Sequence, residues 1–265
     1  MLICITNDFF TRNLVENMFE LEIKKLKLAK KFRGLKIVQI SDLHISKFNI
    51  ELMDGIVEKI NSLNADIVVI TGDFICNGGH CLAELKSFLS NINAKINKYA
   101  CMGNHDYSDN DCGQKVEKML SSCDFKLLKN SREEIFFNYC KLGIAGLDDP
   151  ELGQICYRDA AIEREDIILS HNPITFMEAQ KYSPALMLSG HTHGGQIRCG
   201  FLRFICTKLL SYDYIEGLYK KNDSLLYVNR GIGNVVFKPK IFDKEIFIET
   251  PRINAKAEIT VFEFV

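Results

Sequence analysis

The sequence predicts an α/β domain in which two β-sheets pack against each other. Up to residue 106, short and continuously apolar runs alternate with segments of helical periodicity, as expected for buried parallel strands joined by helices. After residue 124, strand-like segments follow one another with little helix between them, which indicates a second sheet. No internal repeat or linker divides the chain, so we expect a single domain over residues 1–265.

The first half supplies strands and helices in alternation. Strands are expected at 19–28, 35–40, 67–70 and 99–102, and helices at 50–63 and around 81–92. The apolar alternation of the first strand slips at Lys24-Lys25, which predicts a bulge there, within an N-terminal strand region 19–33. Gly34 then provides a turn into the second strand.

The second half is read as strands. They are expected at 135–146, 166–170, 185–189, 225–229, 246–249 and 258–264, and the last three make up a C-terminal strand region 225–264. We expect these segments to supply the second sheet.

The composition excludes several classes of protein. With 265 residues, 47% hydrophobic and 25% charged, the chain is an ordinary globular protein, and its net charge of −1 gives no general attraction to nucleic acid. We therefore expect no nucleic-acid partner. No apolar run reaches the roughly 18 residues of a membrane-spanning helix. The ten cysteines form no C-x-x-C pair and no export signal precedes them, so we expect reduced thiols and a cytoplasmic location.

Polar side chains gather where the expected strands end. Asp42, His44, Asp73, Asn104, His105, Asp106, His171, His191 and His193 all follow apolar runs, and these include five of the six histidines. A single histidine at a strand end is usually a solvated loop residue, but strand ends converge in an open α/β sheet. Imidazole nitrogens with carboxylate and amide oxygens suit Mn²⁺, Fe or Zn²⁺. Glycines beside them would admit an anion, so the pattern predicts a metal site with an anionic ligand.

These residues carry a family resemblance. Asp42-x-His44, Gly72-Asp73, Gly103-Asn104-His105-Asp106, His171 and Gly190-His191-Thr192-His193 resemble, in order and spacing, the signature of the calcineurin-like metallophosphoesterases. The segments 190–198, 146–150 and 229–233 are similar to a branch of small bacterial phosphoesterases that are often membrane-associated. The resemblance implies a four-layer fold, with two mixed sheets flanked by helices and the metal motifs within residues 42–193.

The resemblance also implies a dinuclear metal centre. Asp42, His44 and His193 would hold one divalent ion, Asn104, His171 and His191 the other, and Asp73 would bridge them. A hydroxide held between the ions would attack a phosphate ester or phosphoanhydride. Mn²⁺ is the first expectation, with Fe, Zn²⁺ and Mg²⁺ as alternatives.

Six further residues are candidates around this centre. His105 would stay off the metals and stabilise developing charge or protonate the leaving oxygen. Asp106 would either orient His105 or cap a turn. Arg198 and His80 could contact substrate phosphate, or be a solvated strand arginine and a plain loop histidine. Asp148-Asp149 could line the rim, or form an Asp-Asp-Pro turn.

The substrate stays open at this point. Besides a generic phosphate ester, the chain could act as a pyrophosphatase on UDP-2,3-diacylglucosamine in lipid A synthesis, because residues 201–210 are apolar with two cations. That segment and the six basic residues within 24–33 could dock on anionic lipid at the inner membrane face, or be an edge strand guarded by lysines. A non-catalytic binding scaffold of the same fold is the alternative from another class. The sequence does not predict an oligomeric state.

Overall fold

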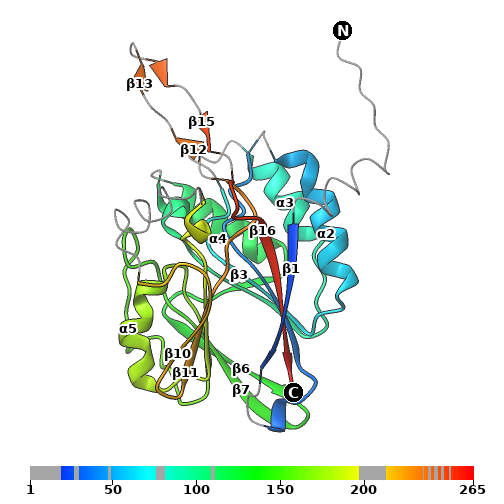
Figure 1. Cartoon of the computed structure of the whole chain (residues 1–265), viewed down its shortest axis with the longest axis vertical. Helices are drawn as coiled ribbons and strands as arrows, with labels where there is room; N and C mark the ends of the chain where they lie inside the picture. Colours follow the sequence, from blue (N-terminus) through cyan, green and yellow to red (C-terminus); the bar gives the residue numbers. More distant parts are fainter. Residues whose placement is uncertain are drawn as a thin grey trace.

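Two six-stranded sheets face each other in the computed structural model (Figure 1). The structure describes residues 19–26, 30–46, 49–75, 81–108, 111–196, 213–234, 236–237, 240–241, 244–245, 248–250 and 252–265. Helices cover the outer face of each sheet, so the predicted arrangement of two mixed sheets flanked by helices is confirmed.

The first sheet is built on a parallel centre. Its order is β1 (Phe19–Leu26), β16 (Ala257–Phe264), β2 (Lys36–Ile40), β3 (Ile67–Thr71), β4 (Asn97–Cys101) and β5 (Phe125–Leu127). Strands β2 to β5 are parallel, whereas β16 runs antiparallel to β2. The predicted bulge in β1 is wrong, because β1 pairs with β16 residue for residue over its whole length. The break in apolar alternation marks a change of the buried face, because Ile23 is 52% exposed whereas Leu26, on the same face as Glu22 and Lys24, is buried between the sheets.

The second sheet has four parallel strands between two antiparallel edges. Its order is β10 (Gly217–Lys221), β11 (Ser224–Val228), β9 (Leu186–Ser189), β8 (Ile167–Leu169), β7 (Cys140–Gly146) and β6 (Ser131–Phe137). The single strand expected at 135–146 is therefore a hairpin. Asn138 and Tyr139 turn the chain with φ values of 49° and 62°, the left-handed conformations that a tight hairpin turn requires.

Two short strand pairs lie outside these sheets. β12 (Val236–Phe237) pairs with β15 (Ile248–Glu249), and β13 (Lys240–Ile241) pairs with β14 (Lys244–Glu245). Only residues 248–249 of the strand expected at 246–249 are described, and they belong to β15 rather than to either large sheet.

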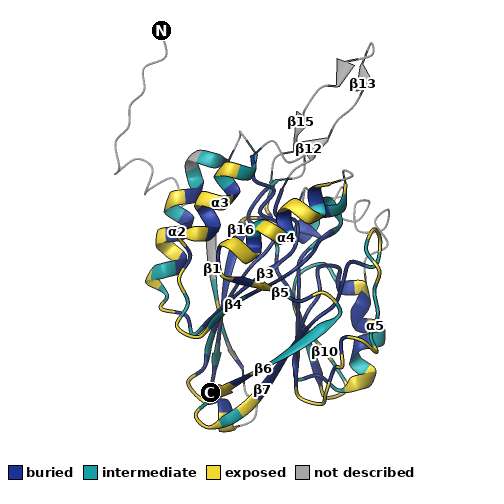
Figure 2. Ribbon diagram, turned by 180° about the vertical axis from the view of Figure 1, so that it is seen from behind, coloured by how far each residue is buried: buried dark blue, intermediate teal, exposed yellow. Residues whose placement is uncertain are grey.

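Amphipathic helices close the outer faces. α2 (Met53–Ser62), α3 (Leu82–Ser90) and α4 (Cys112–Ser122) cover the first sheet, and α5 (Phe176–Ala179) covers the second (Figure 1). Short 3₁₀ turns are η1 (Lys30–Phe32), η2 (Ile50–Leu52), η3 (Asn104–Tyr107), η4 (Pro173–Thr175), η5 (Gln180–Tyr182) and η6 (His193–Gly195). The outward sides of α2, α3 and α4 are exposed, whereas the strands between the layers are buried (Figure 2). Of the described helices, none combines the length and apolarity that a membrane span requires.

Three apolar cores separate the layers, because alternate residues of a buried strand face opposite sides. Ile37 and Val69 point between the sheets, where they join Leu188 of the second sheet. Their neighbours Val38 and Ile70 point to the helices α2 to α4. A third core packs α5 on the second sheet. Cys101 and Cys123 belong to these cores.

A buried charge cluster joins the two sheets. Arg230 follows β11, and its Nε lies 2.9 Å from the Glu258 carboxylate of β16. Its Nη1 lies 3.6 Å from Glu216, and Glu258 also accepts a hydrogen bond from Tyr227 Oη. Glu258 is only 1% exposed. Removing its cationic partner would therefore leave a buried carboxylate without charge compensation.

We expect Arg230→Met to lower the free energy of unfolding by about 3 kcal/mol, since breaking one side of a buried ion pair is strongly destabilising. Urea unfolding followed by circular dichroism measures this. Lys126→Met is the matched control, because its ion pair with Glu133 lies at the surface and should contribute less than about 1 kcal/mol. Equal losses for the two variants would contradict the role given to the Arg230 cluster.

Candidate metal centre

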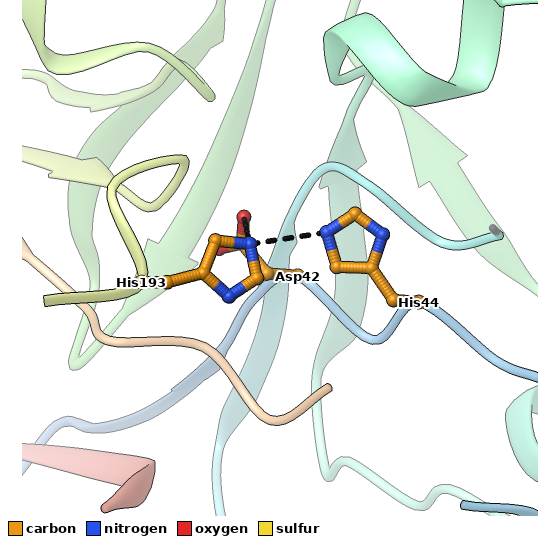
Figure 3. A group of neighbouring side chains, drawn as sticks. All are labelled: Asp42, His44 and His193. Carbon is orange, nitrogen blue, oxygen red and sulfur yellow. Dashed lines mark hydrogen bonds and ion pairs between the residues drawn. The ribbon is translucent and has the colours of Figure 1, made fainter. Parts of the chain in front are cut away.

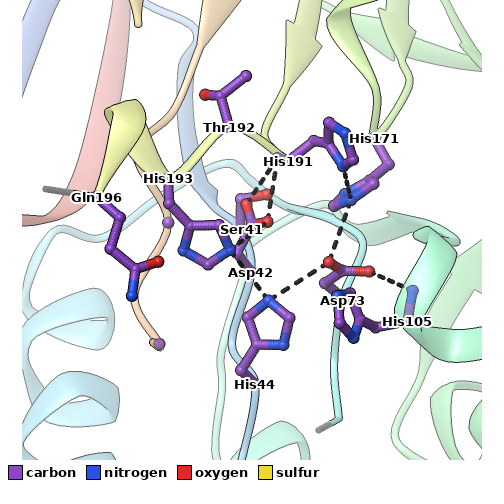
Figure 4. A network of polar contacts seen from close by, with 12 residues as sticks. Ser41, Asp42, His44, Asp73, His105, His171, His191, Thr192, His193 and Gln196 are labelled. Carbon is purple, nitrogen blue, oxygen red and sulfur yellow. Dashed lines mark hydrogen bonds and ion pairs between the residues drawn. The ribbon is translucent and has the colours of Figure 1, made fainter. Parts of the chain in front are cut away.

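The seven candidate ligands come from five strand ends. Asp42 and His44 follow β2, Asp73 follows β3, and Asn104 begins η3 after β4. From the second sheet, His171 follows β8, while His191 and His193 follow β9. The carboxyl ends of parallel strands meet at one edge of a sheet, and here the edges of both sheets meet (Figure 4).

The first group of donors consists of Asp42, His44 and His193 (Figure 3). Nε2 of His193 lies 3.1 Å from Nε2 of His44 and 3.4 Å from Oδ1 of Asp42. All three side chains are buried. Two imidazole nitrogens and a carboxylate oxygen thus converge on one point, which is a donor set that a transition-metal ion accepts.

Asp73 lies between this group and a second one. Its Oδ2 is 3.4 Å from His44 Nε2 and 3.3 Å from His171 Nε2 (Figure 4). The second group adds Asn104, whose Oδ1 lies 3.2 Å from both His171 Nε2 and His191 Nδ1. One carboxylate therefore faces the ring nitrogens of both groups, as a bridging ligand must.

The protonation states of His44, His193 and Asp73 suit a cation. Burial lowers the pKa of His44 to about 3, and it lowers the pKa of His193 as well, so both rings are neutral near pH 7. Burial alone would raise the pKa of Asp73, but the neighbouring His171 and His44 outweigh it and hold that pKa below its usual range. Neutral imidazoles and an ionised carboxylate are the forms that bind metal. Burial alone would lower the pKa of His171, but the charge of Asp73 outweighs it and raises that pKa well above its usual value, so His171 would have to release a proton to bind an ion.

The backbone at these positions is held in an uncommon conformation. Non-glycine residues rarely adopt positive φ, and residues that do so cluster at functional sites. Five of the seven candidate ligands have it: Asp42 (49°), His44 (40°), Asp73 (56°), His191 (72°) and His193 (50°). The strand-end loops are thus shaped to direct these side chains at one another, at a cost to local backbone stability.

A later segment braces the loop of Asp42. The amide of Ile232 donates to Ser41 O at 2.9 Å, and the amide of Gly233 donates to Asp42 O at 2.7 Å. A side chain on Gly231, whose φ is 75°, would lie 2.6 Å from Cβ of Asp42. These contacts give the motif at residues 229–233 a structural purpose, which the sequence alone did not supply.

The comparisons with known proteins agree with this geometry. The family model of the calcineurin-like phosphoesterases matches residues 35–195. The chain is 34% identical over 267 residues to the uncharacterized metallophosphoesterase YkuE of Bacillus subtilis, covering 96% of this chain and 88% of YkuE. This chain belongs to the calcineurin-like phosphoesterase family. It is therefore a hydrolase of phosphoric ester bonds, from a family that depends on divalent metal ions.

Two further relatives bear on fold and substrate. The chain is 30% identical over 284 residues to the UDP-2,3-diacylglucosamine pyrophosphatase LpxG of Chlamydia trachomatis, covering 84% of this chain and 86% of LpxG. A solved dimetal phosphatase from Danio rerio has a TM-score of 0.50 at 12% identity, covering 88% of this chain and 100% of that one. The latter likeness shows a common fold.

In this phosphoesterase, His105 stands beside both donor groups. Its backbone N–H donates to Asp73 Oδ1 at 2.9 Å, and its ring packs edge-on against His44 with centroids 4.8 Å apart. A ring nitrogen of His105 also lies within 4.8 Å of donor atoms of His44 and Asp73, so distance alone does not separate it from the ligands. His105 is half-buried, whereas His44 and Asp73 are buried.

Asp106 is tied to the backbone rather than to the His105 ring. Its carboxylate accepts hydrogen bonds from the amides of Asp73 at 3.0 Å, Phe74 at 2.9 Å and Gly103 at 2.9 Å. Burial, with the charge of Asp73, raises the pKa of Asp106 to about 7. Of the two roles considered from sequence, this geometry favours the capping one, and it fixes the two loops that carry Asp73 and Asn104.

We expect Gly103→Ala to disrupt this metal centre, because the new Cβ would meet the Asp73 carboxylate and lie 2.6 Å from its backbone nitrogen. The Asp73 nitrogen donates to Asp106 and the Asp73 Oδ1 accepts the amide of His105, so the loop has no cheap way to yield. We predict loss of bound Mn²⁺ together with a lower melting temperature, measured by elemental analysis and calorimetry. Gly34→Ala is the comparison, since no atom of the described residues lies within 4 Å of the new Cβ, although its own φ of 92° brings some strain. Normal metal content in Gly103→Ala would contradict the packing argument.

Asp148 and Asp149 form a loop rather than the rim of the site. Both are buried, and Asp149 Oδ1 accepts the amides of Glu151 and Leu152, each at 2.9 Å. Asp148 accepts a hydrogen bond from Tyr107 Oη and another from the amide of Gln154. The turn interpretation of this motif is therefore the one that the structure supports.

Sequence reasoning missed two charged residues next to ligands. Glu151, which directly follows the 146–150 motif, lies 3.4 Å from His191 Nε2. Arg252 Nη2 lies 3.1 Å from His193 Nδ1 and also donates to Gly233 O. Position after the motif could have drawn attention to Glu151, whereas no local pattern marks Arg252. The candidate substrate residues Arg198 and His80 lie outside the described residues, as does the apolar segment 201–210.

Proposed function

We propose that this chain is a dinuclear metal-dependent hydrolase of a phosphate ester or phosphoanhydride. The observation that carries the proposal is the position of Asp73, whose Oδ2 lies 3.4 Å from His44 and 3.3 Å from His171. Asp42, His44 and His193 would hold one divalent ion, and Asn104, His171 and His191 the other, with Asp73 shared. Bound there, two cations would supply an activated water and neutralise charge on the phosphoryl oxygens.

The chain's own residues do the remaining work in this proposal. His105 is our candidate for the group that stabilises developing charge or gives a proton to the leaving oxygen, because its ring is half-buried beside Asp73. Asp106 keeps the two ligand-bearing loops in register through three backbone amides. The strained strand-end backbones direct the ligands before substrate arrives, so little reorganisation would be needed during turnover.

Mn²⁺ is our first candidate for the metal. The donors are nitrogen and oxygen, and thiolate is absent from the described donor groups, which suits Mn²⁺, Fe or Zn²⁺. Metal-stripped protein reconstituted with each ion in turn, followed by elemental analysis, would rank them.

A lipid-linked pyrophosphate is the more specific substrate that we propose to test. Its support is the 30% identity with a UDP-2,3-diacylglucosamine pyrophosphatase over 84% of this chain. The basic residues within 24–33 support docking on anionic lipid only in part. Two of them already have acidic partners, since Lys24 pairs with Glu22 at 2.6 Å and Lys31 with Glu165 at 3.2 Å. These pairs reduce the positive charge that this segment would offer to a membrane.

The deciding experiment is hydrolysis of bis-p-nitrophenyl phosphate and p-nitrophenyl phosphate by metal-stripped protein, with and without added Mn²⁺. We expect release of p-nitrophenol that depends on Mn²⁺ and disappears in the Asp73→Asn variant. UDP-2,3-diacylglucosamine follows as substrate, with UDP-glucose as the control that lacks acyl chains. Folded protein that hydrolyses none of these substrates with any divalent metal would favour a binding scaffold instead.

A further inference from the structure

In each of the four candidate ligand histidines, one ring nitrogen faces the donor group and the other, here called the outer nitrogen, faces away from it. The four outer nitrogens differ in their partners. A histidine that binds metal through one nitrogen usually donates its other N–H to a carboxylate or carbonyl, which fixes the ring and its tautomer. His171 Nδ1 lies 2.7 Å from the carbonyl of Thr71, and His191 Nε2 lies 3.4 Å from the carboxylate of Glu151. In the first group, His193 Nδ1 faces the Arg252 guanidinium, and the buried His44 Nδ1 has no hydrogen-bond partner among the described residues.

The position of Glu151 is set by contacts on several sides. Its backbone amide donates to Asp149 Oδ1 at 2.9 Å, so the buried turn holds the main chain. Its Oε1 accepts a hydrogen bond from Asn172 Nδ2 at 2.9 Å. Asn172 is itself fixed, since its Oδ1 accepts the amide of Ile174 at the start of η4. Glu151 is therefore held in place before any metal binds.

The charge and exposure of this pair suit an orienting contact. The Glu151 side chain is 47% exposed, so keeping its carboxylate ionised costs little, whereas the His191 side chain is 8% exposed. An acceptor at Nε2 places the proton of the neutral ring there. It leaves the Nδ1 lone pair directed at Asn104 Oδ1 and His171 Nε2, each 3.2 Å away.

We propose that Glu151 is a positioning residue for the second donor group, holding His191 by its outer ring N–H so that Nδ1 points to the ion shared with Asn104 and His171. This inference rests on the proposed dinuclear function. It says that the carboxylate of Glu151 sets the metal affinity of one of the two positions in the proposed centre. Glu151 itself touches neither the ion nor the substrate in this role.

Metal binding rather than turnover is the primary test. Calorimetric titration of metal-stripped protein with Mn²⁺ should show two binding events. Glu151→Ala should weaken one of them by about 10- to 100-fold and leave the other within about twofold, as is typical when the partner of a ligand histidine is lost. Glu151→Gln should lose less Mn²⁺ affinity than Glu151→Ala, because its amide oxygen can still accept the His191 N–H. Glu58→Ala, an exposed glutamate of α2, is the matched control and should change neither event.

A kinetic readout separates positioning from a general structural role. The Mn²⁺ concentration for half-maximal rate should rise at least about tenfold in Glu151→Ala, while the rate at saturating Mn²⁺ stays close to that of the wild type. Unchanged affinity at both positions, equal weakening of both, or a raised KM for substrate with normal metal binding would each overturn the inference. If the wild-type chain binds no divalent metal, the proposed function fails, and the inference with it. Two tight sites that Glu151 does not affect would overturn the inference alone.

Discussion

Asp73→Asn should abolish Mn²⁺-dependent hydrolysis and remove both metal ions. Asparagine keeps the size of the side chain and an oxygen that can accept the His105 amide, now 2.9 Å from Oδ1. It replaces the other oxygen, which faces His44 and His171, by an amide NH₂ that cannot bind metal. Because that oxygen is the one shared by both donor groups, we expect a rate loss of about 10³-fold or more.

The measurement for this variant is elemental analysis beside the steady-state rate. Asp54→Asn, on the exposed face of α2, is the control for the chemical change and should keep full metal content. Circular dichroism would establish that Asp73→Asn is folded. If the folded variant still held two ions per chain, Asp73 would not be the shared ligand, and the assignment of both groups would need revision.

The side chains that the sequence proposed as ligands lie close together in the structure, because the signal for their position is local. Each candidate ligand comes shortly after an apolar strand. Because parallel strands point the same way, their carboxyl ends lie at the same edge of the sheet, and the candidate ligands gather there. Asp42 and His193 are 151 residues apart in the chain, yet their donor atoms lie 3.4 Å apart. Apolar runs also placed most strands, since the buried strands of both sheets are continuously hydrophobic.

The errors arose where tertiary contacts override the local pattern. The apolar alternation of β1 breaks at Lys25-Leu26, but Leu26 is buried between the sheets on the face that carries Glu22 and Lys24, so the strand continues without an extra residue. The hairpin of β6 and β7 was hidden because its turn residues, Asn138 and Tyr139, interrupt the pattern only briefly.

Residues that act through ligands were harder to find than the ligands. Glu151 lies 40 residues before His191, and Arg252 lies 59 residues after His193. Neither contact leaves a periodic or spacing signal, since each depends on where a loop turns in space. The same holds for the 229–233 segment, whose amides reach the Asp42 loop from the end of β11, next to β9 in the second sheet.

His105→Asn should lower the turnover number by about two to four orders of magnitude while both metal ions stay bound. The backbone amide of His105, which donates to Asp73, is unchanged by the substitution, so the loop keeps its anchor. What is lost is a ring beside the donor groups that could carry a proton to a leaving oxygen. The measurement is kcat together with Mn²⁺ content, and Ser108→Ala in the same turn is the control.

Comparing substrates with different leaving groups distinguishes the two roles considered for His105. If the His105 ring donates a proton to the departing oxygen, the defect in His105→Asn should be large for an alkyl phosphate and small for a p-nitrophenyl ester, because p-nitrophenolate leaves without protonation. A defect of equal size for both leaving groups would instead indicate stabilisation of charge on the phosphoryl oxygens. Loss of one metal ion in the variant would contradict both roles, since His105 would then be a ligand, as its distance of at most 4.8 Å from donor atoms of His44 and Asp73 permits.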